Sequence, residues 1–141
     1  MDAKNAAARR HKILVVDDNE VIVNTLSSHL KHAGFDVIAA YDGAQAVSIV
    51  RKESPDLILL DITFPPDIQG VPWDGFRVME WLHRVDEAKR IPVIIITGGE
   101  EASDKEMALS GGAVAFFKKP IDDKDLIRVI RSTLNTAPRA D

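Results

Sequence analysis

With 141 residues, of which 45% are hydrophobic, the chain is the length of a single domain and has enough apolar residues for one core. Its 18 basic and 22 acidic residues give a net charge of −4, so it lacks the positive charge that direct binding to DNA or RNA requires. It contains no cysteine, which excludes disulfide bonds, thiolate metal sites and thiol redox chemistry.

The chain begins with an alanine-rich polar segment, residues 1–11, which has no periodic apolar face and is expected to be a mobile arm. This segment lacks the apolar core of a signal peptide, and no later run approaches the roughly 20 residues that span a bilayer. We therefore expect a cytoplasmic protein that is not inserted in a membrane. Residues 12–135 are the predicted domain, and residues 136–141 are a C-terminal tail.

The first predicted strand is Lys12–Asp17. Asn19 then caps a helix with apolar residues at four-residue spacing, and Gly34 ends this helix. A short second strand follows at Phe35–Ala40. The predicted domain thus begins with a strand, a helix and a second strand.

The second helix begins at Asp42, because Gln45 three residues later completes a pattern that resembles a capping box. This helix ends at Ser54, since the residue before a proline is disfavoured in helices. Asp56–Asp61 is the third predicted strand. Its apolar run from Leu57 to Leu60 is unbroken, as is typical of strands buried on both faces of a parallel sheet.

Residues 62–73 contain three prolines and a glycine, which predict an extended irregular loop. Asp74 caps a third helix, and Arg90–Thr97 is the fourth strand. The next predicted helix begins near Gly99 and carries few apolar residues, so we expect it to be the least firmly anchored.

The chain ends with a fifth strand, Ala113–Phe117, and a helix that opens at Asp122. Five alternations of strand and helix predict an α/β fold of the doubly wound (βα)5 type. It has a five-stranded parallel sheet with helices on both faces, because right-handed crossovers place them there.

Several polar residues stand where the predicted strands end, at the sheet edge where open α/β sheets bind ligands. They are Asp17, Asp18, Asp61, Thr97 and Lys119. Such clustered carboxylates need neutralisation, and Mg2+ prefers oxygen ligands that include one or two carboxylates and phosphate. Lysine and hydroxyl groups suit the charge of a transferred phosphoryl group, and a carboxylate can be the nucleophile. Isolated residues of these types are usually only solvated, but five complementary groups indicate phosphoryl chemistry.

The chain resembles the receiver domains of response regulators, the phosphoacceptor modules of two-component signalling. The matching motifs are Ile13–Asp18, Leu57–Asp61 with Pro65 four residues on, Val93–Thr97 and Phe117–Pro120. The resemblance extends from Lys12 to Leu134 and implies the flavodoxin-like strand order 2-1-3-4-5.

By this resemblance, Asp61 accepts a phosphoryl group from a histidine kinase or a histidine phosphotransfer protein. Mg2+ is held by Asp17, Asp18, Asp61 and the backbone carbonyl of Thr63. Thr97 and Lys119 contact the phosphoryl group. The protein is then a signalling phosphoacceptor rather than an enzyme, with self-catalysed phosphoryl transfer and hydrolysis of its own aspartyl phosphate.

The resemblance also implies a switch, in which Thr97 and the aromatic residue three positions before Lys119, Phe116, alter a surface that a downstream protein reads. Phe116 has no hydroxyl group, which removes one possible hydrogen bond but not the rotation of the side chain. The segment Phe64–Trp73 is longer than the family's usual loop and is expected to affect access to the site or partner choice.

The sequence disfavours two other functions. A receiver-like interaction module that is never phosphorylated is disfavoured because all five site residues are present. A flavin- or nucleotide-binding protein would need a phosphate-binding loop rich in glycine or hydroxyl residues after the first strand, but Asp17–Glu20 is acidic. Arg128 and Arg131 on the last helix are expected to be a solvated face, with partner binding as the alternative.

Overall fold

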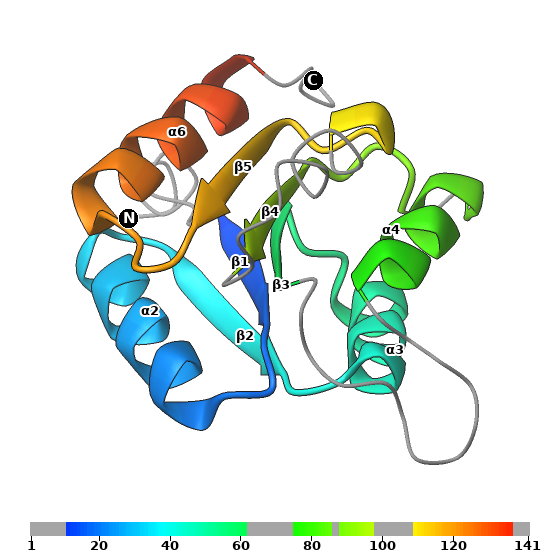
Figure 1. The fold of residues 1–141 in the computed structure, drawn as a ribbon, viewed down its shortest axis with the longest axis horizontal. Helices are drawn as coiled ribbons and strands as arrows, with labels where there is room; N and C mark the ends of the chain where they lie inside the picture. Colours follow the sequence, from blue (N-terminus) through cyan, green and yellow to red (C-terminus); the bar gives the residue numbers. More distant parts are fainter. Residues whose placement is uncertain (1–10, 62–74, 86–87, 98–108, 137–141) are drawn as a thin grey trace, which may run out of the picture.

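The computed structural model describes residues 11–61, 75–85, 88–97 and 109–136. It contains one five-stranded sheet in the order β2-β1-β3-β4-β5, with every neighbouring pair parallel (Figure 1). The strands are β1 (Lys12–Val16), β2 (Asp36–Ala40), β3 (Leu57–Asp61), β4 (Val93–Thr97) and β5 (Ala115–Lys118). The predicted parallel sheet and its strand order are confirmed.

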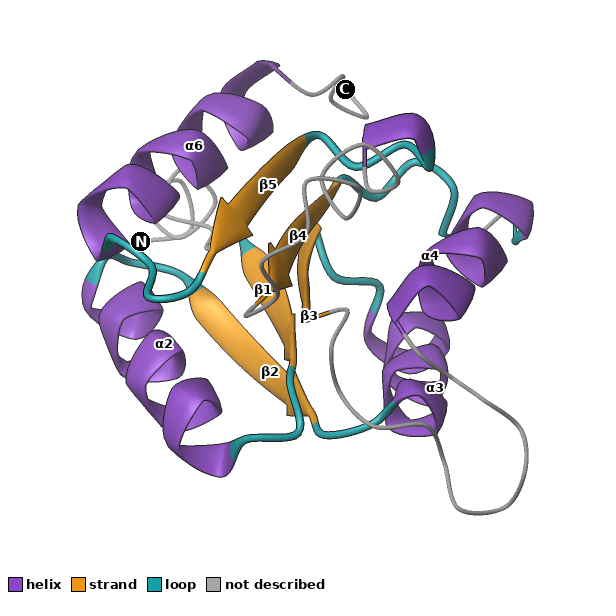
Figure 2. Cartoon of the chain, viewed as in Figure 1, coloured by secondary structure: helices purple, strands orange, loops and turns teal. Residues whose placement is uncertain are grey.

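Helices cover both faces of this sheet (Figure 2). Those in the described residues are α2 (Glu20–His32), α3 (Gly43–Glu53), α4 (Gly75–Arg84) and α6 (Asp123–Thr136). One apolar cluster joins the sheet to α2 and α6, and a second joins it to α3 and α4. The described helices do not include one that is long and apolar enough to cross a bilayer.

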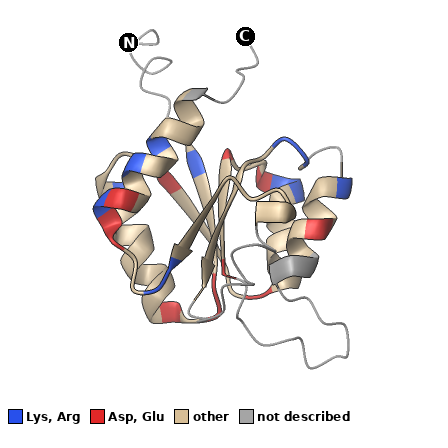
Figure 3. Cartoon of the chain, turned by 45° about the horizontal axis from the view of Figure 1, so that its top comes forward, with Lys and Arg blue, Asp and Glu red and all other residues tan. Residues whose placement is uncertain are grey.

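The central strand β3 contributes to both apolar clusters. Leu57 and Leu59 belong to the cluster under α2 and α6, whereas Ile58 and Leu60 belong to the cluster under α3 and α4. This division follows from the alternation of side chains along a strand. The four apolar residues of β3 are buried, as their unbroken run predicted, and Asp61 at the end of the strand is buried as well. Charged residues of the strands lie at strand ends (Figure 3).

Two predicted helix starts are confirmed by hydrogen bonds. The Asn19 side chain accepts from the backbone N–H groups of Val21 (2.9 Å) and Ile22 (3.3 Å) at the start of α2. The Asp42 side chain accepts from the backbone N–H of Gln45 (2.8 Å) at the start of α3. These bonds satisfy donors that a helix cannot pair internally.

The observed strand limits differ most from the predicted ones at the starts of β4 and β5, whereas the other limits differ by at most one residue. Strand β4 begins at Val93 rather than Arg90, because the preceding residues form a turn in which the N–H of Ile91 donates to the carbonyl of Ala88. Strand β5 begins at Ala115 rather than Ala113, three residues after Gly112, whose φ of +103° is readily adopted only by glycine.

Several expectations concern residues outside the described part of the chain. These are the N-terminal arm, the extended loop 62–73, the cap at Asp74, the start of the helix near Gly99 and the C-terminal tail.

Candidate functional site

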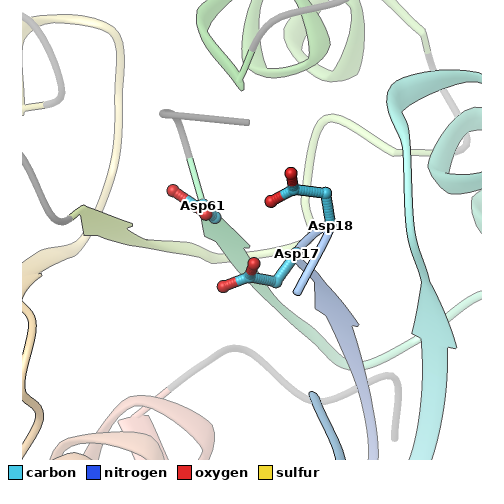
Figure 4. A group of neighbouring side chains, drawn as sticks. All are labelled: Asp17, Asp18 and Asp61. Carbon is cyan, nitrogen blue, oxygen red and sulfur yellow. The ribbon is translucent and has the colours of Figure 1, made fainter. Parts of the chain in front are cut away.

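Three carboxylates meet at the carboxyl ends of β1 and β3. Asp61 is the last residue of β3, and Asp17 and Asp18 directly follow β1, which is hydrogen-bonded to β3. One carboxylate oxygen from each residue lies within 4.8 Å of the others, as Figure 4 illustrates. The strand-end pattern therefore placed these residues correctly. Carboxylate oxygens are the type of ligand that a hard divalent cation prefers.

Lys119 joins two of these carboxylates. Its Nζ lies 3.0 Å from Asp17 Oδ2 and 3.1 Å from Asp61 Oδ2. Asp17 and Asp61 are each only 2% exposed, whereas Asp18 is exposed. Buried acidic side chains normally require a partner, and the ammonium group of Lys119 supplies it.

Thr97 ends β4 beside Asp61. In the sheet register Asp61 pairs with Ile96, and Thr97 pairs with Lys118. Thr97 is fully buried, and its carbonyl accepts a hydrogen bond of 2.8 Å from the backbone N–H of Lys119. This backbone hydrogen bond holds the end of β4, which carries Thr97, next to the segment that carries Lys119.

Comparison with known proteins agrees with this geometry. The family model of the response regulator receiver domain matches residues 13–131. The chain belongs to this family. It functions as a receiver domain of two-component signalling.

Solved receiver domains have the same fold. The receiver domain of NtrX from Brucella abortus is 29% identical, with a TM-score of 0.77, and the match covers 88% of this chain and 98% of that one. A CheY-like receiver domain protein from Methanospirillum hungatei is 25% identical, with a TM-score of 0.78 and coverage of 89% and 94%. The receiver domain of a histidine kinase from Syntrophus aciditrophicus is 27% identical, with a TM-score of 0.80 and coverage of 93% and 95%.

One contact in this receiver domain was not predicted. The backbone N–H of Asn19 donates to Asp17 Oδ1 at 2.9 Å. Asn19 therefore fixes the Asp17 carboxylate with its main chain while its side chain caps α2. An aspartate two residues before a helix cap is a recognisable signal for such a turn, because Asp side chains bond to backbone N–H groups two residues ahead.

The charges of the site shift two pKa values. Burial raises the pKa of Asp17, and the nearby Asp61 carboxylate adds to this effect, although hydrogen bonds from Asn19 and Lys119 oppose it. Burial alone would lower the pKa of Lys119, but its bonds and attraction to Asp17 and Asp61 outweigh burial and raise it. The ammonium form of Lys119 is therefore secured at neutral pH, while the negative charge on Asp17 is costly.

The raised pKa of Asp17 predicts a stability effect. The folded state of the metal-free protein loses stability relative to the unfolded chain as pH rises from the ordinary value of 3.8 through the folded pKa, because the charged form is disfavoured when folded. Asp17→Asn removes this penalty. We expect it to raise the melting temperature at neutral pH by about 3 °C, the shift that roughly 1 kcal/mol gives in a domain of this size.

This advantage should shrink as the pH falls toward 3.8, where the wild-type carboxyl group is increasingly protonated in both states. Melting curves recorded in a chelator between neutral and acidic pH measure it, and Asp18→Asn at the exposed neighbour is the control. A lower melting temperature for Asp17→Asn at neutral pH would contradict the inference that the charged Asp17 carboxylate destabilises the metal-free folded state.

The two residues expected to form the switch share a face of the sheet. Thr97 and Ile95 point to the same face because they are two residues apart on β4. Phe116 pairs with Ile95 in the register and is half-buried against the cluster under α3 and α4. Thr63, the expected carbonyl ligand of a metal, lies outside the described residues.

Proposed function

We propose that Asp61 accepts a phosphoryl group from a phosphohistidine on a sensor kinase or a histidine phosphotransfer protein. The observation that carries this proposal is the bridge from Lys119 Nζ to both Asp17 and Asp61 (3.0 and 3.1 Å) within a cluster of three carboxylates. A carboxylate nucleophile beside a fixed cation is the arrangement that phosphoryl transfer requires.

In this reaction an oxygen of the Asp61 carboxylate attacks phosphorus. The P–O bond forms as the P–N bond to the donor histidine breaks, and the imidazole keeps the electron pair and takes up a proton. Lys119 binds the negative charge that spreads over the phosphoryl oxygens. The product is an aspartyl phosphate, which water hydrolyses back to aspartate and phosphate, so the protein is a self-modifying signalling phosphoacceptor rather than an enzyme with a separate product.

The site also fits Mg2+. Its ligands would be Asp17, Asp18, Asp61 and the backbone carbonyl of Thr63, all oxygen donors. When bound, the ion supplies positive charge that offsets the repulsion between the carboxylates and an incoming phosphoryl group. The role of Asn19 is then to hold Asp17 in one orientation through its N–H.

Phosphorylation then changes a protein-binding surface. A phosphoryl group on Asp61 offers the Thr97 hydroxyl a charge-assisted hydrogen bond, which draws the side chain toward the site. Phe116 lies on the same face of the sheet and can rotate into the space that Thr97 leaves. The surface read by the downstream protein includes β5 and α6.

Mass spectrometry of the intact protein tests this function. After exposure to a small phosphodonor such as acetyl phosphate with Mg2+, we expect the protein to gain the mass of one phosphoryl group, and to gain none when a chelator removes the metal. Asp61→Asn is the matched control, since it keeps the shape of the side chain but not the nucleophilic charge. If the wild-type protein gains no mass while a phosphorylatable receiver domain run alongside does, the chain is instead an unphosphorylated interaction module.

A further inference from the structure

A groove lies between the C-terminal end of α2 and residues 124–131 of α6. It is lined by Ala33, Lys124, Ile127, Arg128 and Arg131. Its volume of about 430 Å3 is within the range of about 300–1,000 Å3 that is common for ligand-binding pockets. The proposed phosphoryl transfer at Asp61 does not use these residues.

The groove combines an apolar floor with a cationic rim. Ile127 and Ala33 are partly buried and pack against the cluster under α2 and α6. Lys124, Arg128 and Arg131 are spaced four and three residues apart, so they lie on one face of α6, a helix whose ribbon carries several basic positions in Figure 3. Their aliphatic stems add to the apolar surface while their charged ends remain in water.

The charges of the rim are available to a ligand. Arg128 pairs with Asp125 at 2.9 Å, but the two side chains are 72% and 54% exposed, and such ion pairs are weak and readily exchanged. Arg131 donates from Nη2 to the Ala33 carbonyl at 3.0 Å, which ties α6 to the end of α2, and a guanidinium has further N–H donors for a second partner. The nearby Asp123 carboxylate is already paired with His29.

We propose that this groove binds an acidic amphipathic segment of a partner protein. An aliphatic side chain of the partner sits on Ile127 and Ala33, and its carboxylates meet Lys124, Arg128 and Arg131. The lining contains three cations and no acidic residue, although the whole chain has a net charge of −4, so the groove is locally complementary to acidic ligands. Its apolar floor has no aromatic side chain on which a nucleic-acid base could stack, which favours a peptide.

This surface is separate from the phosphoacceptor site. Helix α2 has 13 residues and is about 20 Å long at roughly 1.5 Å per residue, with Asn19 beside Asp17 at one end and Ala33 beside the groove at the other. A ligand in the groove can therefore bind without contacting Asp61, and the proposal goes beyond the phosphoacceptor function.

Two synthetic helical peptides of equal negative charge test the proposal. One carries leucine flanked by glutamates three and four residues away, and the other carries serine in place of leucine. Titration into 15N-labelled protein should shift the amide resonances of Ala33, Ile127 and Arg128 with the leucine peptide, and much less with the serine peptide. Lys124→Glu combined with Arg128→Glu should raise the dissociation constant about tenfold or more.

Lys52→Glu combined with Arg90→Glu makes the same change in net charge at exposed positions outside the groove and should leave the dissociation constant unchanged. The groove variant should still gain a phosphoryl group, which separates this proposal from the phosphoacceptor function. Absence of binding at millimolar peptide, equal binding of both peptides, or equal weakening by the control variant would overturn it. Equally strong binding of inorganic tripolyphosphate, or self-association lost in the groove variant, would assign the groove to a small anion or to a second copy of the chain instead.

Discussion

Lys119→Met should slow the phosphorylation of Asp61 about 100-fold or more, the loss seen when one donor that stabilises developing charge is removed. In the structure the ammonium group lies 3.0 Å from Asp17 and 3.1 Å from Asp61. Without this ammonium group, the negative charge of two buried carboxylates repels the incoming phosphoryl group more strongly. Removing one partner of a buried ion pair also leaves uncompensated charge, so the variant should melt at a lower temperature in the absence of metal.

The rate is measured by intact-mass spectrometry over time at fixed phosphodonor and Mg2+ concentrations. Lys118→Met is the matched control, because it removes the same positive charge from the adjacent lysine, which is exposed. Its phosphorylation rate should match that of the wild-type protein. Equal slowing in both variants would mean that general surface charge, rather than the position of Lys119, governs the reaction.

Thr97→Ala should separate phosphorylation from switching. The variant keeps Asp17, Asp61 and Lys119, so it should still accept the phosphoryl group. It loses a hydrogen bond to a charged group, which contributes about 1.5–3 kcal/mol, and therefore loses a bias of about 10- to 150-fold toward the switched state. In 15N spectra, the resonance changes that phosphorylation causes in β5 of the wild-type protein should largely disappear.

Thr97→Ser retains the hydroxyl group and should restore these changes, which separates the hydrogen bond from the effect of altering a fully buried residue. Unchanged switching in Thr97→Ala would contradict the role assigned to its hydroxyl. Changes confined to the neighbourhood of Asp61 in the wild-type protein would instead direct attention to the segment 64–73 as the output surface.

The fold could be predicted because each strand of the sheet has a local sequence signature. The run Leu57–Leu60 is apolar at every position, as is typical of a strand buried on both faces, and the structure divides it between two clusters. The predicted strand limits were less accurate where a hydrogen-bonded turn precedes the strand, as in the turn closed by the bond from Ile91 to Ala88. An apolar residue in a turn cannot be distinguished from one in a strand by periodicity alone.

The positions of the candidate site residues were predictable from one topological rule, that the carboxyl ends of parallel strands share an edge. This rule brought Asp17, Asp18 and Asp61 together, and the structure places Thr97 and Lys119 beside them. The contacts themselves were not predictable. That Lys119 binds two carboxylates at once, and that the N–H of Asn19 fixes Asp17, depend on distances across the sheet and on loop geometry that sequence spacing does not define.

The most direct measurement is the location of the phosphoryl group. After treatment with a phosphodonor and Mg2+, borohydride reduces an aspartyl phosphate to homoserine, and peptide mass spectrometry then identifies the altered residue. We expect homoserine at position 61, and none when the metal is chelated or when Asp61 is replaced by asparagine. Homoserine at another aspartate, such as Asp17 or Asp18, or a phosphoryl group that resists reduction, would contradict it.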